Sequence, residues 1–382
     1  MLAAILPISR KKVFYRFAVG CYFFLSGTAF ASWASRIPTI KEVFNLNEAE
    51  LGSVLFLLPL GSLSVLPLSG WSISKYGSRL ITLLSAIGHA SVLLSIAFSD
   101  SIFMLSVSLF LFGFTGNALN ISMNTQALEL QEHIYQRPLM SSFHGLWSFG
   151  AMFGAIIGGW MVSSDVSMGQ QYLFLALCMW VVYFTAYHFL VRGSISHGRM
   201  KLEWPSRALW LLGIICFCCA ICEGAMADWS SLYYQQVVNT GEKVNTTGYT
   251  AYALMMALGR IAGDKLIKRF GSRQVLLIDS VFIAIGFAIG VGVIHPLAVV
   301  LGFGMIGLGV STIIPIVYTL AGKNRDRPPS VSLAAVTSIG FIGFLAGPPV
   351  IGYVAHAIGL RLALLLLVFM ALIITVLSRK VR

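Results

Sequence analysis

Twelve long apolar runs constrain this chain more than any other feature of its sequence. A helix needs about 20 mostly apolar residues to cross the hydrocarbon core of a bilayer, and each run is about that long. The runs are residues 13–35, 48–72, 79–98, 101–128, 138–163, 170–191, 207–235, 247–269, 274–294, 296–322, 330–356 and 359–379. Strands of a membrane barrel are shorter and alternate polar with apolar residues. The pattern therefore predicts an all-α membrane protein with 12 transmembrane helices.

The composition excludes several other classes of protein. Charged residues make up only 10% of the chain and hydrophobic residues 57%, whereas a soluble domain carries about 25% charge. So few charges cannot cover a water-facing surface, which excludes a soluble enzyme, a nucleic-acid binder and a disordered chain. We expect the outer surface of the protein to contact the lipid bilayer and expect no binding of nucleic acid.

The positive residues predict the orientation of the chain in the membrane. If the N-terminus is cytoplasmic, 21 of the 26 Lys and Arg residues fall in segments on the inner side and four in segments on the outer side. Cytoplasmic loops carry such an excess of Lys and Arg. We therefore expect both termini in the cytoplasm and interpret the net charge of +12 as retention on that side. The short loops favour a bacterial inner (cell) membrane.

The two halves of the chain repeat one another at an offset of slightly more than 190 residues. The matched segments are 75–79 with 269–273, 30–33 with 226–229, Gly113 and Gly116 with Gly304 and Gly307, and Gly154 and Gly159 with Gly347 and Gly352. Parallel repeats related by an axis along the membrane normal are an architecture of transporters, with the substrate site near the midplane. The predicted domains are an N-terminal six-helix bundle (1–191), a cytoplasmic linker (192–206) and a C-terminal six-helix bundle (207–382).

The loop after the second run resembles a motif of the major facilitator superfamily of secondary transporters. Gly70, Lys75, Gly77 and Arg79 fit the motif, while Ser74 replaces its acidic residue. The second copy of this loop keeps further basic residues and glycine. Its residues are Arg260, Asp264, Arg269, Gly271 and Arg273.

The resemblance covers the whole chain and implies two pseudo-symmetric six-helix bundles that transport by alternating access. It also implies that the basic residues of both loops take part in gating. Arg260 and Asp264 are four apart, so they can pair along one helix face. Three short segments are similar to a bacterial inner-membrane branch distantly similar to sugar permeases: 123–127, 142–144 and 228–230.

Three ionisable side chains inside the predicted spans are candidates for carrying a proton. Ionisable groups in a membrane span are costly and mark functional sites. Glu223 has no opposite charge among its neighbours in sequence, His144 titrates near neutral pH, and Asp228 lies beside Trp229. Arg36 can pair with Asp228 as part of an outer gate. The alternative for each is an ordinary hydrogen-bonding role in packing.

A stripe of amides and several aromatic residues are candidates for binding a polar substrate. Asn117, Asn120 and Asn124 are spaced three and four apart, which places them on one helix face. Hydrocarbon cannot satisfy amides, so they face protein or water; hydrogen bonding between helices is the alternative role. The further candidates are Trp147, Tyr249, Tyr252, Ser311 and Tyr318.

These residues favour a proton-coupled secondary active transporter of a polar small molecule, such as a sugar-like metabolite. An efflux transporter of drugs or metabolites on the same fold is the first alternative, and a membrane ligand sensor that does not transport is the second. No GxxxxGK[ST], HExxH or GxSxG motif occurs, so neither ATP-driven transport nor an intramembrane enzyme is expected. We expect a monomer without metal or cofactor.

Overall fold

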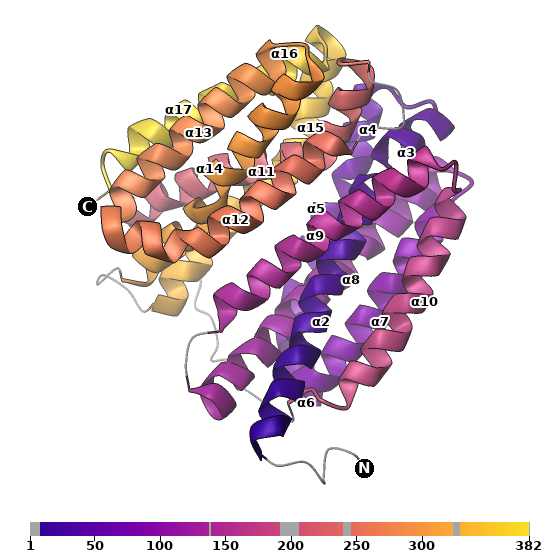
Figure 1. Ribbon diagram of the computed structural model, residues 1–382, viewed down its shortest axis with the longest axis vertical. Helices are drawn as coiled ribbons and strands as arrows, with labels where there is room; N and C mark the ends of the chain where they lie inside the picture. The colour runs from indigo at the N-terminus through magenta and orange to yellow at the C-terminus, as the bar shows by residue number, and fades with distance from the viewer. Residues whose placement is uncertain (1–7, 137–138, 192–205, 240–245, 324–328, 382) are drawn as a thin grey trace. The chain divides into compact units, whose positions relative to one another are not determined.

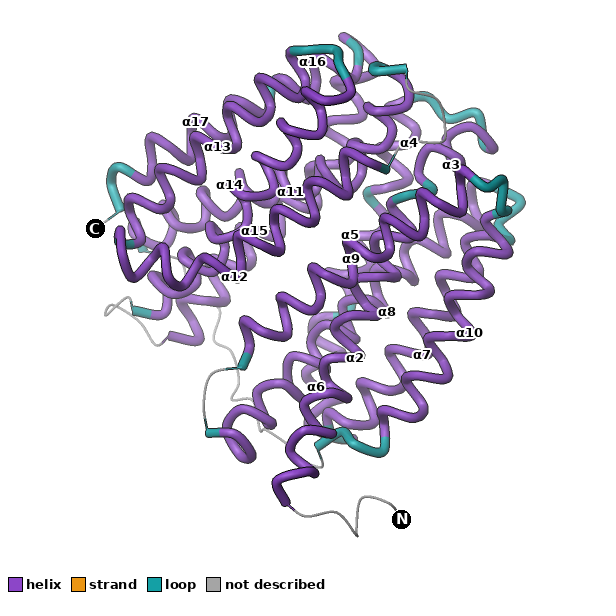
Figure 2. The backbone as a smooth tube through the Cα atoms, viewed as in Figure 1, coloured by secondary structure: helices purple, strands orange, loops and turns teal. Residues whose placement is uncertain are grey.

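The computed structural model describes residues 8–136, 139–191, 206–239, 246–323 and 329–381. Within these ranges the chain consists of helices joined by loops and contains no strand (Figures 1 and 2). Eleven of the helical segments in the described residues are long and apolar enough to cross a membrane. The predicted all-α membrane fold is therefore confirmed.

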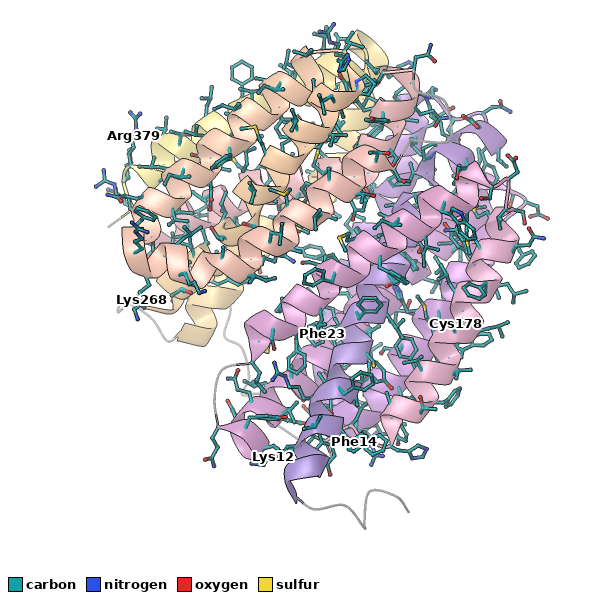
Figure 3. All side chains as sticks on the ribbon, in the orientation of Figure 1. Lys12, Phe14, Phe23, Cys178, Lys268 and Arg379 are labelled. Carbon is teal, nitrogen blue, oxygen red and sulfur yellow. The ribbon has the colours of Figure 1, made fainter. Side chains whose placement is uncertain are left out.

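The one predicted span that is not among those eleven is 247–269, the eighth along the chain. It forms the helix α12 (Thr247–Phe270). The reason is the charge of its second half, where Arg260, Asp264, Lys265, Lys268 and Arg269 follow one another within ten residues. Lys268 lies near the end of this helix (Figure 3).

Helices that contact one another group into two compact units. The first unit comprises residues 1–36 and 57–198. Its helices are α2 (Ile8–Ala34), α5 (Leu57–Ser64), α6 (Leu66–Tyr76), α7 (Ser78–Ala97), α8 (Ile102–Glu129), a π-helical turn η1 (Leu130–Tyr135), α9 (Met140–Ser163) and α10 (Met168–Tyr187). Within it, α2 packs on α9, and α8 packs on both α5 and α7.

The second unit comprises residues 37–56 and 199–382. Its helices are α3 (Ile37–Val43), α4 (Glu48–Leu55), α11 (Arg207–Gln236), α12, α13 (Ser272–Gly292), α14 (Pro296–Gly322), α15 (Pro329–Ile358), α16 (Leu360–Leu365) and α17 (Leu367–Ser378). Here α11 packs on α15, and α14 packs on both α12 and α13. The predicted boundaries of the two six-helix bundles, 1–191 and 207–382, stay a prediction.

The short helices α3 and α4 belong to the second unit because of close contacts with its other helices. Gly52 on α4 faces Gly352 on α15, and a Cβ added at Gly352 would lie 2.5 Å from the Glu48 carbonyl oxygen. The Ser53 and Tyr353 hydroxyl oxygens are 3.3 Å apart. Small residues let two helix backbones approach this closely.

Prolines divide the second predicted span into α4, α5 and α6. A proline ring clashes with the carbonyl four residues earlier and lacks an N–H. Pro59 and Pro67 therefore disturb the helix near Leu55 and Leu63, and the breaks fall at Phe56 and Val65. The last carbonyls of α5 consequently need hydrogen-bond donors from outside their own helix.

Glycine contacts reproduce the internal repeat in three dimensions. A Cβ added at Gly113 would lie 1.8 Å from the Leu58 carbonyl oxygen, and one added at Gly307 would lie 2.2 Å from that of Tyr252. Both members of the second pair are displaced by 194 positions from the first. Gly113 thus corresponds structurally to Gly307, whereas the sequence comparison matched it with Gly304; one turn of helix explains the difference.

A second pair of contacts gives the same result for other helices. Gly150 on α9 lies against the Phe24 carbonyl of α2, and Gly343 on α15 lies against the Phe217 carbonyl of α11. Both partners are displaced by 193 positions. The loop glycines Gly77 and Gly271 also share a left-handed backbone, with φ of 81° and 82°. The two halves are therefore built on one helix-packing plan.

Candidate functional site

Glu223 on α11 and Arg260 on α12 form an ion pair inside the second unit. The Arg260 Nη2 atom lies 3.6 Å from the Glu223 Oε1 atom, and the two side chains are 19% and 16% exposed. The sequence neighbours of Glu223 carry no positive charge, and its partner comes instead from the next helix. The side chain of Asp264, the predicted partner of Arg260, lies outside the described residues.

The tyrosines predicted to bind substrate share the face of α12 that carries Arg260. At about 100° per residue, Tyr249, Tyr252 and Arg260 fall on one stripe. The exposed residues Leu254, Leu258 and Ile261 occupy the opposite side of the helix. Arg260 is therefore turned away from the apolar outer face of α12 and toward the other helices of its unit.

Tyr249, Tyr252 and Tyr318 lie in the same unit as this pair, near enough to Glu223 for its charge to act on each phenol group. Tyr249 and Tyr252 are only 2% and 1% exposed, and their rings are tilted against each other with centroids 5.8 Å apart. Tyr318 on α14 is half-buried. Tyr318 is thus the most accessible of the three tyrosines.

Glycines on α12 hold it tightly against α14 on both sides of Arg260. A Cβ added at Gly259 would lie 2.3 Å from the Ser311 hydroxyl oxygen, and one added at Gly263 would lie 2.7 Å from the Thr312 methyl carbon. Ser311 is 1% exposed, and its hydroxyl donates to the Leu308 carbonyl of its own helix at 2.6 Å. Ser311, a predicted substrate residue, is therefore a packing residue in this structure.

The three asparagines of α8 form a hydrogen-bonded ladder in the first unit. Asn124 Nδ2 donates to Asn120 Oδ1 at 2.9 Å, and Asn120 Nδ2 lies 3.5 Å from Asn117 Oδ1. Asn117 Nδ2 in turn donates to the Ser62 carbonyl at 2.6 Å, which is one of the last carbonyls of α5. Asn117 thus satisfies a carbonyl at the end of α5. This is hydrogen bonding between helices, the role that the sequence offered as the alternative to substrate binding.

The ladder lies opposite the outer apolar stripe of α8. Val107 and Leu111 are 42% and 40% exposed, and the helical repeat places Asn120 about 180° from Leu111. Asn120 is itself exposed and Asn124 half-buried. Asn120 and Asn124 are thus only partly covered by protein, and their predicted role in binding substrate stays a prediction.

His144 and Trp147 lie on α9 in the same unit, next to aromatic residues of α2. The His144 ring meets Phe23 edge-on, with centroids 5.5 Å apart, and Trp147 is tilted against Phe30 at 6.0 Å. His144 is exposed and Trp147 half-buried. Their predicted roles in proton coupling and substrate binding stay predictions.

Arg36 is buried at the end of α2 in the first unit. Its Nε donates to Gln171 Oε1 and its Nη2 to the Val166 carbonyl, both at 2.6 Å. Asp228, its predicted gating partner, is half-buried on α11 of the second unit. The predicted pairing of the two stays untested, while the contacts of Arg36 give it a structural role within its own unit.

The basic residues of the repeated loops stack on aromatic rings. Lys75 lies 4.9 Å from the Trp71 ring centre, Arg79 lies 4.3 Å from that of Tyr187, and Arg269 lies 5.3 Å from that of Phe270. Ser74, which replaces the acid of the motif, donates to the Gly70 carbonyl of its own helix. Gating by these residues, and by Arg273, stays a prediction.

The sequence did not single out a buried network around Glu129 at the end of α8. The Glu129 carboxylate accepts from the Ser78 hydroxyl at 2.9 Å and from Gln126 Nε2 at 3.0 Å. Gln126 also holds both backbone groups of Val191. The signal available in the sequence was an acid three residues after a glutamine, but Ser78 is distant in the chain and only the fold supplies it.

The helical architecture, the duplicated glycine contacts and the ion pair between apolar helices define a polytopic membrane protein of the transporter class. A model of the Major Facilitator Superfamily matches residues 18–332. The chain belongs to this superfamily and is a transporter, not an enzyme.

Relatives of similar length support this assignment. An uncharacterized MFS-type transporter of Yersinia pestis is 32% identical over 346 residues, which cover 89% of each chain. The membrane protein MosC of Rhizobium meliloti is 31% identical over 363 residues, covering 94% of this chain and 88% of MosC.

Solved structures share the fold at low identity. A mutant of the nucleoside transporter NupG matches with a TM-score of 0.79 at 12% identity, covering 96% of this chain and 99% of NupG. A bacterial homolog of the human lysosomal transporter Spinster matches with a TM-score of 0.72 at 12% identity, covering 97% and 98%. At these identities the likeness shows the fold alone.

Proposed function

We propose that this protein is a proton-coupled secondary active transporter of a polar small molecule. The observation that carries the proposal is the ion pair of Glu223 and Arg260, two ionisable groups that α11 and α12 turn toward the inside of the second unit. Arg260 at 3.6 Å balances the charge of Glu223 when its proton leaves, since a nearby opposite charge favours the ionised form. One charge crossing the membrane is worth about 2.3 kcal/mol per 100 mV, enough for tenfold accumulation or more.

Asn120 and Asn124 support the polar character of the substrate, since carboxamides both donate and accept hydrogen bonds. Alternating access in this proposal means that the two halves take turns in opening a path to either side. Of the proteins that share the fold, NupG is named a nucleoside transporter and MFSD10 an organic anion transporter; both names describe polar solutes.

We further propose a monomer in a bacterial inner membrane with both termini in the cytoplasm. The distribution of Lys and Arg supports this orientation. Labelling of single cysteines placed near each terminus, from outside intact cells, tests it: neither position should react until the membrane is opened. Light scattering of the purified protein measures the oligomeric state, and a single-chain mass is expected.

Proton coupling is tested in proteoliposomes that contain a pH-sensitive dye. Addition of polar metabolites, pooled and then singly, should acidify the lumen with the wild-type protein. Glu223→Gln keeps the size of the side chain but cannot carry a proton, so we expect it to abolish the acidification. Glu132→Gln, at an exposed position of η1, is the matched control and should behave as wild type. Unchanged proton movement with Glu223→Gln would contradict the assignment of the proton to Glu223.

A further inference from the structure

The ion pair is not required to build the bundle in which it lies, because the other repeat does without it. The offset of 194 that relates Leu58 to Tyr252 places Leu66 at the position of Arg260. The offsets of 193 to 196 between α2 and α11 place Glu223 within the range 27–30, which holds no charged residue. The same glycine contacts form in both halves, so packing does not explain the two charges.

The pair is longer than a direct charge-assisted hydrogen bond and is not fully buried. Charge-assisted hydrogen bonds between a nitrogen and an oxygen are about 2.7–2.9 Å long, whereas Arg260 Nη2 and Glu223 Oε1 are 3.6 Å apart. Both side chains keep part of their surface exposed, at 19% and 16%. A small solute can therefore touch both members of the pair.

The backbone on either side of Arg260 is fixed in place. Gly259 and Gly263 lie against Ser311 and Thr312 of α14 at contact distances that would not accept even a methyl group. A guanidinium carried by such a segment is held in position before a ligand arrives, which lowers the cost of binding. Its planar fork of N–H donors fits a carboxylate with two parallel hydrogen bonds.

We propose that Arg260 binds a carboxylate group of the substrate and that Glu223 holds the guanidinium when no substrate is bound. One guanidinium balances one carboxylate, so the substrate class is a polar organic acid such as a sugar acid. The inference rests on the proposed transport function and assigns Arg260, which the sequence had placed in a gate, to substrate recognition.

The exchange keeps the charge of the site constant, so one proton and one carboxylate cross together without net charge, and the pH gradient rather than the membrane potential drives them. When Glu223 takes a proton it becomes neutral and releases Arg260, which the substrate carboxylate then neutralises. The other titratable groups near Glu223 are Tyr249 and Tyr252 of α12, Tyr318 of α14, and Cys216 and Cys219 of its own helix. Among the described residues none of these groups is a second cation, and Arg260 is the cation that pairs with Glu223.

The test measures which solutes the purified protein retains. Full-length protein in lipid nanodiscs is equilibrated with matched pairs of acids and neutral analogues (glucuronate with glucose, galacturonate with galactose, gluconate with sorbitol) together with a bacterial extract of polar metabolites. Retained solutes are identified by mass spectrometry. We expect the wild-type protein to retain carboxylates over their neutral analogues.

Arg260→Leu, which restores the residue of the other repeat, should weaken retention of those acids about tenfold to hundredfold. Lys268→Gln removes a positive charge from the exposed end of the same helix and should retain them as wild type. Because Arg260→Leu leaves the Glu223 charge without its partner, the neutral pair Glu223→Gln with Arg260→Gln is the second variant, and it should lose the acids while folding normally.

Retention of neutral solutes only, of no carboxylate at all, or of carboxylates equally by the folded Arg260 variants overturns the proposal. Flux measurements separate this from the transport function. If a neutral solute is retained and crosses the membrane of proteoliposomes, the transport function holds and the carboxylate proposal fails. If acids are retained through Arg260 but do not cross, the carboxylate site holds and the transport function fails.

Discussion

The Thr312 hydroxyl on α14 donates a hydrogen bond to the Asp279 carboxylate on α13. Asp279 is 7% and Thr312 4% exposed, and the Asp279 carbonyl lies against Gly309 of α14. A carboxyl group between two apolar helices costs free energy unless it is hydrogen-bonded. This bond therefore stabilises the contact between α13 and α14.

Replacing Thr312 with valine should destabilise the protein. Valine keeps the shape of threonine but cannot donate, so the buried carboxyl group loses its partner at a cost of about 1–3 kcal/mol. Thermal unfolding of the purified protein measures the change, and a lowered Tm is expected. Thr312→Ser keeps the hydroxyl and should lie between valine and wild type. Equal Tm values for Thr312→Val and wild type would show that the bond contributes nothing.

A methyl group at Gly307 should disturb the packing of α12 on α14. The added Cβ of Gly307→Ala would lie 2.2 Å from the Tyr252 carbonyl oxygen, so the helices have to separate, and overpacking of this kind costs about 1–3 kcal/mol. Gly347→Ala on α15 is the control, because no atom lies within 4 Å of its added Cβ. That variant should be neutral or slightly stabilised, since alanine favours a helix. A Tm for Gly307→Ala above that of Gly347→Ala would contradict the close packing of α12 on α14 at Gly307.

Removing the Gln126 amide should destabilise the buried network of the first unit. Gln126→Leu leaves the Glu129 carboxylate with one donor fewer and the Val191 backbone groups without their side-chain partner. The expected cost is about 1–3 kcal/mol per buried group, measured as a lowered Tm. Gln236→Leu at the exposed end of α11 is the control and should change Tm little. A Tm for Gln126→Leu as high as that of the control would contradict this account.

Substitution of two asparagines of α8 should have different effects, on stability at Asn117 and on transport at Asn124. Asn117→Ala removes the donor of the Ser62 carbonyl and should lower the Tm. Asn124→Ala, whose Nδ2 bonds only within the ladder and its own helix, should leave the Tm nearly unchanged and reduce solute-driven proton movement. Measuring both quantities for both variants checks the distinction, and identical profiles would contradict it.

The positions of the long helices followed directly from the sequence, because a helix needs about 20 apolar residues to cross the bilayer and runs of that length recur along the chain. The repeat was also visible, through Gly77 and Gly271 at one offset. Its register inside α8 and α14 was set wrongly by one turn, since glycines recur every few residues and only the carbonyl that each one touches shows which are equivalent.

The candidate site was predicted by residue type but not by pairing. Glu223 stood out because an acid in an apolar run is costly, but its neighbours in sequence offer no opposite charge and could not show which residue pairs with it. Arg260 lies 37 positions away and reaches it only because α11 and α12 pack against common neighbours. Ser311 and Asn117 looked like ligand residues, yet Ser311 donates to a carbonyl of its own helix and Asn117 to the Ser62 carbonyl, which the fold brings near.

The sequence by itself determined that this chain is a duplicated bundle of membrane helices, because the burial of apolar residues in lipid depends on composition and spacing along the chain. Only the tertiary structure decided which polar groups meet, because hydrogen bonds and ion pairs act over a few ångströms. Whether a buried polar side chain is occupied or open to a ligand depends on neighbours that are remote in sequence.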